Sequence, residues 1–300
     1  MHKENIKAYI AWLTVCILWG TTYLAIRIGV KDLPPTLFAG LRWLIAGPIF
    51  FLFLKLRGYS LPKKEDIKHI ALIGLLLLGV GNGLLIFAEQ WVPSGLTALL
   101  TTTMPFWIVG IESLLPSGPK INFKIISGLI MGLAGVGLIL GVDLTQFESS
   151  YLTGIIGLMI GVCGWAVGTI YSKYKRVDVH PLMSAAIQMC IAGFALTLLG
   201  VILGEIPALH LTQNSVFAFI YLLIFGAFIG YGAYIYAVAN LPVSFVSTYA
   251  YINPVIALFL GWLVLNEKID FTIIAAAGII LTGVYIVKKG NEIRIKTNLT

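Results

Sequence analysis

One arginine, Arg42, lies inside a hydrophobic run that extends from Thr36 to Leu56. A charge at the centre of a bilayer costs about 2.5–3.5 kcal/mol on insertion scales, so such a residue is expected to face the interior of a helix bundle. There, the planar guanidinium group can bind a carboxylate or a phosphate through two parallel hydrogen bonds. The alternative is a structural ion pair with Glu89, which lies near the end of a later apolar run.

Glu89 and Glu112 are the only acidic residues within the apolar runs. A carboxyl group away from water can exchange a proton near neutral pH, so Glu89 is a candidate for proton coupling. Glu89 could instead pair with Arg42 or meet the headgroups. Glu112 is interpreted as an interfacial acid near the end of its run.

A set of aromatic and amide side chains also lies within the predicted helices, and the predicted depth of Trp19, Trp165, Tyr231 and Asn253 is near the midplane. Small-molecule sites combine apolar walls with a few polar groups, whereas aromatic residues at helical spacing more often serve packing or an interfacial belt. Tyr249 and Tyr251 are two residues apart on one helix, so at most one of them can point fully inward. The predicted substrate path contains Trp19, Tyr23, Arg42, Asn82, Trp165, Gln188, Tyr231, Tyr251 and Asn253.

Two prolines, Pro105 and Pro254, fall in the middle of predicted helices. An interior proline frees a carbonyl group and kinks the helix. The two kinks could act as gates or could be static features of the helices.

Motifs for other chemistry are missing from the sequence. We find no H-E-x-x-H, G-x-S-x-G, Walker or CxxC sequence, and the histidines fall at the tail or at the edges of apolar runs. Cys16, Cys163 and Cys190 are interpreted as packing residues. We therefore expect no enzyme, no metal site and no cofactor.

The elements that hold these residues are long apolar runs. The chain is 59% hydrophobic and only 11% charged, which indicates a polytopic membrane protein. Breaks at proline, glycine and charged residues divide it into ten predicted transmembrane helices, because open sheet edges cannot face lipid. They cover residues 8–29, 36–56, 69–90, 93–115, 123–142, 152–173, 182–203, 215–239, 242–265 and 271–288.

The positive charges predict the orientation of these helices. With a cytoplasmic N-terminus, 16 of the 20 lysines and arginines fall in cytoplasmic segments. This bias follows the positive-inside rule and places both termini in the cytoplasm. The net charge of +7 is therefore an insertion signal, and we expect no nucleic-acid partner.

The chain also repeats itself. A shift of 146 residues aligns 19–47 with 165–193, matching Arg42 with Gln188, and a shift of 149 aligns 81–105 with 230–254. Five helices per unit is an odd number, so the second unit enters the membrane from the opposite side. Inverted repeats of this kind are typical of secondary transporters, whose substrate sites lie near the midplane between the repeats.

Several motifs resemble those of the EamA family in the drug/metabolite transporter superfamily. They are WGTTYLAIRIGV at 19–30, the segment 35–47, GNG at 81–83, AEQWVPSG at 88–95 and TYAYINP at 248–254. The resemblance implies a first unit at 10–141, a second at 153–287 and a central cavity lined by both. It also implies an acidic residue after the fourth helix of each unit. Glu267 matches in the second unit, whereas Ser117-Gly118-Pro119 stands there in the first.

Together these features predict an all-α protein of the inner membrane that exports small metabolites, such as amino-acid-like solutes, by alternating access. The resemblance implies cargo among amino acids, amines or nucleotide-type metabolites. An uncoupled facilitator or channel is the first alternative, and a membrane sensor or intramembrane enzyme the second. The predicted partners are a small solute and the lipid bilayer, and the sequence predicts no oligomeric state.

Overall fold

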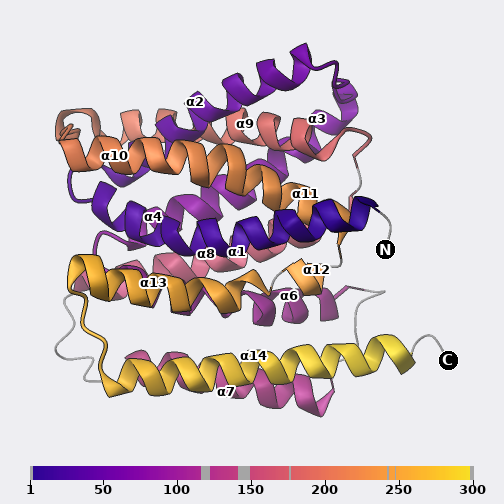
Figure 1. The fold of residues 1–300 in the computed structure, drawn as a ribbon, viewed down its shortest axis with the longest axis vertical. Helices are drawn as coiled ribbons and strands as arrows, with labels where there is room; N and C mark the ends of the chain where they lie inside the picture. Colours follow the sequence, from indigo (N-terminus) through magenta and orange to yellow (C-terminus); the bar gives the residue numbers. More distant parts are fainter. Residues whose placement is uncertain are drawn as a thin grey trace.

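The computed structural model describes residues 3–115, 122–140, 149–175, 177–241, 243–246 and 248–297. All regular secondary structure within these ranges is helical (Figure 1). The helices are α1 (Lys3–Gly29), α2 (Pro35–Leu56), α3 (Lys64–Gly74), η1 (Leu75–Asn82), α4 (Gly83–Ala88), α5 (Ser94–Thr101), α6 (Met104–Ser113), α7 (Phe123–Leu140), α8 (Ser149–Tyr174), α9 (Pro181–Ile202), η2 (Ile206–Ala208), α10 (Gln213–Tyr221), η3 (Leu222–Tyr231), α11 (Gly232–Asn240), α12 (Val243–Val246), α13 (Tyr249–Leu265) and α14 (Phe271–Thr297).

Within the described ranges, seven helical stretches are long and apolar enough to cross a membrane, and three shorter helices are also apolar. The seven fall on seven of the ten expected ranges, and the shorter helices α7, α13 and α14 fall on the other three. Residues 141, 142, 242 and 247, which belong to expected ranges, lie outside the described residues. The chain is therefore an all-helical, multi-pass membrane protein.

Four of the expected helices are less regular than the sequence pattern predicts. The third and eighth contain the π-helical segments η1 and η3, and the fourth is interrupted at Thr102 and Thr103, between α5 and α6. The ninth is divided between α12 and α13, with Thr248 in a turn. A π-helical segment shifts the register of the side chains that follow it, and such segments are frequent at functional sites. Apolar periodicity over a whole run does not detect a local change of this size.

Helices α2 and α9 begin and end by the same local rules. Each has a proline at its first position, where the missing N–H group has no helical partner to lose. Shortly after each helix ends, a glycine takes a left-handed conformation, Gly58 at φ +82° and Gly204 at φ +74°. The two helices have the same length, 22 residues.

Glycines let α2 and α9 lie backbone to backbone. A Cβ atom placed on Gly47 would lie 2.5 Å from the Cys190 nitrogen, and one on Gly193 would lie 2.3 Å from the Leu44 nitrogen. Small residues permit this close approach in membranes, where apolar surfaces gain little by mutual burial. Helices α7 and α14 pack in the same way, through Gly128 and Gly283.

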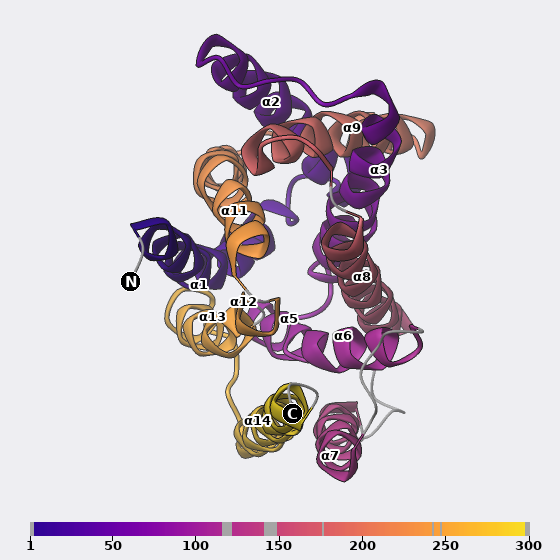
Figure 2. The ribbon, with the colours of Figure 1, turned by 90° about the vertical axis from the view of Figure 1, so that its right-hand side faces the viewer.

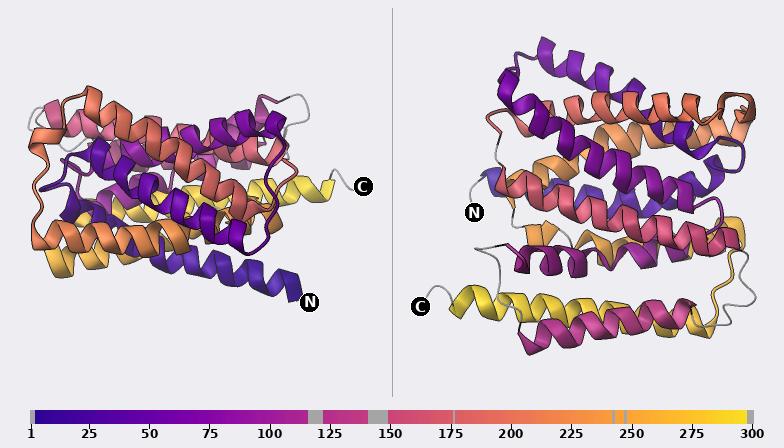
Figure 3. Two further views of the ribbon diagram at one scale, coloured as in Figure 1. Left: turned by 90° about the horizontal axis from the view of Figure 1, so that it is seen from above. Right: turned by 180° about the vertical axis from the view of Figure 1, so that it is seen from behind.

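The remaining helices surround the centre of the molecule. Seen end-on, α1, α13, α5, α6, α8, α3, α9 and α11 follow one another in a ring, with α2 outside α9 and the pair α7 and α14 to one side (Figure 2). The view from behind also shows α7 and α14 side by side and apart from the ring (Figure 3). The central residues are thus positioned by helices from both halves of the sequence.

Connecting loops meet at each end of the molecule. At one end, Lys63 forms an ion pair with Asp178 at 3.1 Å, and its hydrogen bond with Asp178 raises the pKa of Lys63. At the other end, the Thr212 hydroxyl donates to Asp32 Oδ2 at 2.6 Å. The start of α1 and the end of α14 lie at the same end of the molecule (Figure 1). We call this the terminal end.

Two glutamates cap helices from the other half of the chain. Glu205 accepts a hydrogen bond from the Leu37 nitrogen at 2.8 Å, at the start of α2. Glu267 accepts from the Ser94 nitrogen at 2.9 Å and from the Ser94 hydroxyl, at the start of α5. Carboxylates are stabilised at helix N-termini, where N–H groups lack helical partners. The Ser117-Gly118-Pro119 segment lies outside the described residues.

Candidate functional site

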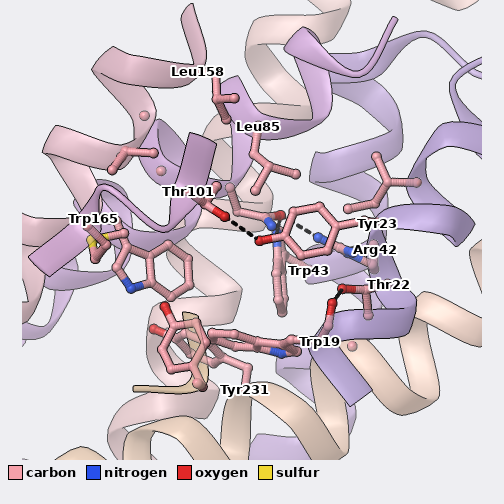
Figure 4. A pocket seen from close by; sticks show the side chains of 18 residues that line it. Trp19, Thr22, Tyr23, Arg42, Trp43, Leu85, Thr101, Leu158, Trp165 and Tyr231 are labelled. Carbon is pink, nitrogen blue, oxygen red and sulfur yellow. Dashed lines mark hydrogen bonds between the residues drawn. The ribbon is translucent and has the colours of Figure 1, made fainter. Parts of the chain in front are cut away.

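A pocket of about 70 Å³ lies at the centre of the ring (Figure 4). It is lined by side chains from both halves of the chain, including six of the predicted path residues: Trp19, Tyr23, Arg42, Asn82, Trp165 and Tyr231. A volume of this size holds on the order of five water-sized probes and is far smaller than typical drug-sized sites. The pocket therefore offers only a small space in this conformation.

Arg42 is the cation of this pocket, and its side chain is only 2% exposed. Its Nη2 donates a hydrogen bond to Asn82 Oδ1, and its guanidinium carbon lies 4.4 Å from the Trp43 ring centroid. Its Nε has no hydrogen-bond partner among the described residues. No described acidic side chain pairs with Arg42, so the alternative of an ion pair with Glu89 is not the arrangement that the structure has.

The π-helical segments place two polar side chains at the centre. Asn82 is the last residue of η1, and its Oδ1 also accepts a hydrogen bond from Trp43 Nε1 at 3.3 Å. Tyr231 is the last residue of η3, and its hydroxyl donates to Gln188 Oε1. The two segments thus end at the same depth as the pocket, one from each half.

Indole and phenol rings form one wall of the pocket. The Trp19 ring centroid lies 5.4 Å from that of Trp165 in an edge-to-face arrangement, and 5.3 Å from that of Tyr249. Glycines make room for both indoles, since a Cβ atom would lie 2.5 Å from Trp19 Nε1 at Gly230 and 2.8 Å from Trp165 Cε3 at Gly81. This wall offers flat apolar surfaces opposite one charged group.

Gln188 lies behind the pocket wall. It lines a second cavity of about 460 Å³, together with Lys173, Lys175 and Ser184. Its amide donates to the Ser184 hydroxyl at 2.9 Å, while its oxygen accepts from Tyr231. Lys173 also forms an ion pair with Glu112 at 2.9 Å, so Glu112 has a structural partner. The Tyr231–Gln188 hydrogen bond therefore lies between the central pocket and the second cavity.

Glu89 lies outside the central pocket. It follows the last residue of α4 and is fully buried, and neither carboxyl oxygen has a hydrogen-bond partner among the described residues. Arg27 donates a hydrogen bond to the backbone carbonyl oxygen of Glu89 and not to its carboxyl group. Proton coupling through Glu89 stays a prediction.

Other predicted residues also lie outside the pocket. Tyr251 and Asn253 do not line it, and Tyr249 does so instead. The predicted path included Tyr251, but only one of the two tyrosines can point fully inward, and the one that lines the pocket is Tyr249. Asn253 is buried beside the Cys16 carbonyl oxygen, where its amide can tie α13 to α1.

The two prolines are not equivalent in the structure. Pro105 is in the first turn of α6, directly after the break at Thr102 and Thr103, and Pro254 is inside the continuous helix α13. Their roles as gates stay predictions. Thr22, Trp43 and Thr101 line the pocket although the sequence did not single them out. Of these three residues, only Trp43 could have been suspected from the sequence, because it is next to Arg42.

No metal-binding arrangement is present in the ranges that the structure describes, where no three histidine, cysteine or acidic side chains lie together.

Comparisons with known proteins identify the family. The model of the EamA-like transporter family matches residues 6–141 and again residues 152–288. The uncharacterized inner membrane transporter YedA of Escherichia coli strain K12 is 37% identical over 96% of this chain and 92% of its own. The uncharacterized transporter YoaV of Bacillus subtilis strain 168 is 29% identical over 93% of this chain and 96% of its own.

A solved crystal structure superposes with a TM-score of 0.67 at 23% identity, covering 93% of this chain and 96% of the other, so the two share a fold. Two family matches, a relative of 37% identity and a set of long apolar helices agree with one another. The chain is a membrane protein that belongs to the EamA-like transporter family.

Proposed function

We propose that this protein is a secondary transporter that moves small organic solutes bearing a carboxylate, such as amino-acid-like metabolites, out of the cell. The observation that carries the proposal is the buried Arg42, which has no described acidic partner and lines a pocket shared by both halves. A buried, unpaired cation is costly, and an anionic ligand that supplies two acceptor oxygens offsets that cost.

The proposed architecture is two inverted five-helix repeats, at 10–141 and 153–287, that together make ten transmembrane helices. The polar contacts at the centre support it, because the repeat alignment matches Arg42 with Gln188 and Asn82 with Tyr231. One pair of these residues is joined in each half, Arg42 with Asn82 and Gln188 with Tyr231. The π-helical segments η1 and η3 also fall at matching positions.

Contacts at the two ends support the inversion. The alignment matches Asp32 with Asp178, and Lys63 and Thr212 are the N-cap residues of α3 and α10, at corresponding places in the two halves. Asp178 pairs with Lys63 at one end of the molecule, and Asp32 pairs with Thr212 at the other. An exchange of equivalent contacts between opposite ends is what a two-fold axis in the membrane plane produces.

Hydrogen bonds that could act as barriers on the two sides of the pocket support alternating access. The Tyr231–Gln188 bond separates the pocket from the cavity that contains Lys173 and Lys175. The Tyr23 hydroxyl bonds to Thr101 at 2.9 Å on α5, whose first turn is capped by Glu267. Opening one barrier at a time would expose Arg42 to one compartment at a time.

The proposed location is the inner membrane, with both termini in the cytoplasm. Terminal segments that lie at one end of the molecule support an even number of membrane crossings (Figure 1). The lysines of the second cavity belong to segments that the positive-inside rule assigns to the cytoplasm. In this orientation, the second cavity is the cytoplasmic entrance for the solute.

Counterflow in proteoliposomes tests the proposed function. Vesicles that contain purified protein are loaded with unlabelled L-alanine, L-glutamate or succinate, and uptake of the same labelled compound is followed. We call these three compounds the carboxylate probes. A transporter accumulates the label transiently above equilibrium, and the Arg42→Gln variant should lose this accumulation. Equilibration without overshoot would instead indicate an uncoupled facilitator, and no uptake of any carboxylate probe would contradict the proposal.

A further inference from the structure

The carboxyl group of Glu89 is buried and takes no part in the proposed substrate site. Its side chain is 0% exposed, and both oxygens lack a hydrogen-bond donor among the described residues. Burying an ionised carboxylate without a partner costs several kcal/mol, whereas a neutral carboxylic acid avoids most of that cost. In this conformation the group is therefore stable only when it carries a proton.

Glu89 also lies close to the substrate pocket. Its nitrogen donates to the Leu85 carbonyl oxygen at 3.2 Å, and Leu85 lines the pocket. The carboxyl group is thus on a residue one helical turn beyond the pocket wall, toward the end of the molecule opposite the terminal end. A motion that opens the pocket at that end would therefore also change the surroundings of the carboxyl group.

Three described groups that interact electrostatically with Glu89 form their hydrogen bonds with other partners. Arg27 on α1 donates to the backbone oxygen of Glu89 and not to its carboxyl group. Tyr23, one turn earlier on α1, bonds to Thr101, and the Glu267 carboxylate accepts from the start of α5. Arg27 attracts a negative charge on Glu89, whereas Glu267 repels it. Arg27 is therefore the group that can receive the carboxylate once the proton has left.

We propose that Glu89 is the proton-binding site that couples solute transport to the proton gradient, an inference that rests on the proposed transport function. When the pocket opens toward the terminal end, water that enters the pocket reaches the carboxyl group. The Oε–H bond then breaks, the proton passes to water, and the carboxylate pairs with Arg27. When the opposite end opens, the carboxylate takes a proton from water on that side, so each cycle carries one proton from that side to the terminal end while the solute moves the other way.

Infrared spectroscopy of purified protein tests the proton site without any substrate, because the probe is the proton itself. The carbonyl stretch of a protonated carboxylic acid should be present in wild type at neutral pH and absent in Glu89→Gln. The matched control is Glu112→Gln, which removes an acid paired with Lys173 at 2.9 Å and should leave the band unchanged. A wild-type spectrum without the band, or a band that survives in Glu89→Gln, would overturn the assignment.

Proteoliposomes with an imposed pH gradient test the coupling, with L-glutamate as the probe. Wild type should accumulate L-glutamate against its gradient, and Glu89→Gln should lose this accumulation while counterflow remains measurable. Accumulation that is equal in both proteins would overturn the coupling. Absence of counterflow in wild type would overturn transport of this probe and its coupling together, and the infrared result would still decide whether Glu89 binds a proton.

Discussion

At the scale of single residues, one hydrogen bond lies between the central pocket and the second cavity, which Lys173 lines. The Tyr231 hydroxyl donates it to Gln188, and both side chains are buried. Removing the donor leaves the Gln188 oxygen buried without its partner, which costs about 1–3 kcal/mol. That penalty falls on the closed conformation and not on an open one in which water reaches Gln188.

Tyr231→Phe should therefore shift the protein toward the conformation that is open on this side. A single cysteine at Val162, which lines the pocket, would report the shift in a background without Cys16, Cys163 and Cys190. We expect faster labelling by a membrane-impermeant maleimide added on the side of the second cavity. Tyr236→Phe is the matched control, since no described residue bonds to the Tyr236 hydroxyl. Equal labelling rates in the two variants would argue against a gate at Tyr231.

The chemical types of the site residues were easier to predict from the sequence than their partners. A lone arginine in an apolar run identifies a buried cation, and the repeat alignment identifies its counterpart, Gln188. The partners of Arg42 were less predictable, because the ion pair considered with Glu89 depends on side-chain directions that spacing alone does not define. The structure joins Arg42 to Asn82 and leaves the Glu89 carboxyl group without a described partner.

At the scale of the elements, glycines fix how closely the central helices approach. Gly193 faces the backbone of α2, where a Cβ atom would lie 2.3 Å from the Leu44 nitrogen. This contact is between two backbones, so a side chain rotation cannot relieve it. The pair α2 and α9 also holds Arg42 and Gln188, and separating the helices would displace both.

Gly193→Leu should reduce the yield of monodisperse protein and lower its melting temperature, because overpacking costs about 1–3 kcal/mol or more. Size-exclusion chromatography and a thermal melt in detergent measure the two effects. Gly278→Leu on α14 is the matched control, since nothing lies within 4 Å of a Cβ atom at that exposed position. A Gly193→Leu protein as stable as the control would contradict the packing described for α2 and α9.

Element positions followed closely from apolar runs and from prolines and glycines at their ends. The internal breaks did not, because the π-helical segments at Leu75–Asn82 and Leu222–Tyr231 leave the overall hydropathy unchanged. Their effect is a change of register that sends Asn82 and Tyr231 toward the centre. The two π-helical segments lie at matching positions of the two halves, and the average hydropathy of the sequence does not reveal them.

At the scale of the whole molecule, the two halves have matching scaffolds and different chemistry. The alignment matches Arg42 with Gln188 and Glu89 with Val238, so one half supplies the cation of the pocket and the buried acid nearby. Under the proposed alternating access, the scaffold would change conformation symmetrically, while binding would depend on groups from one half. This division explains why a repeat is visible in the sequence although the site itself is not symmetric.

The most direct test of the central claim is binding of a carboxylate solute at Arg42, measured as a shift in melting temperature. Ligands that bind only the folded state raise this temperature as their concentration increases. At least one carboxylate probe should stabilise wild type, whereas glucose and L-alanine methyl ester, which lack a carboxylate, should not. Arg57→Gln, at an exposed position, is the charge-matched control and should behave like wild type.

In folded Arg42→Gln, we expect the apparent affinity for that probe to fall by at least about tenfold, which corresponds to about 1.4 kcal/mol. Arg42→Lys should not restore it fully, because an ammonium group lacks the planar fork. Stabilisation by the probe that persists unchanged in Arg42→Gln, or stabilisation by the methyl ester and glucose alone, would contradict the account.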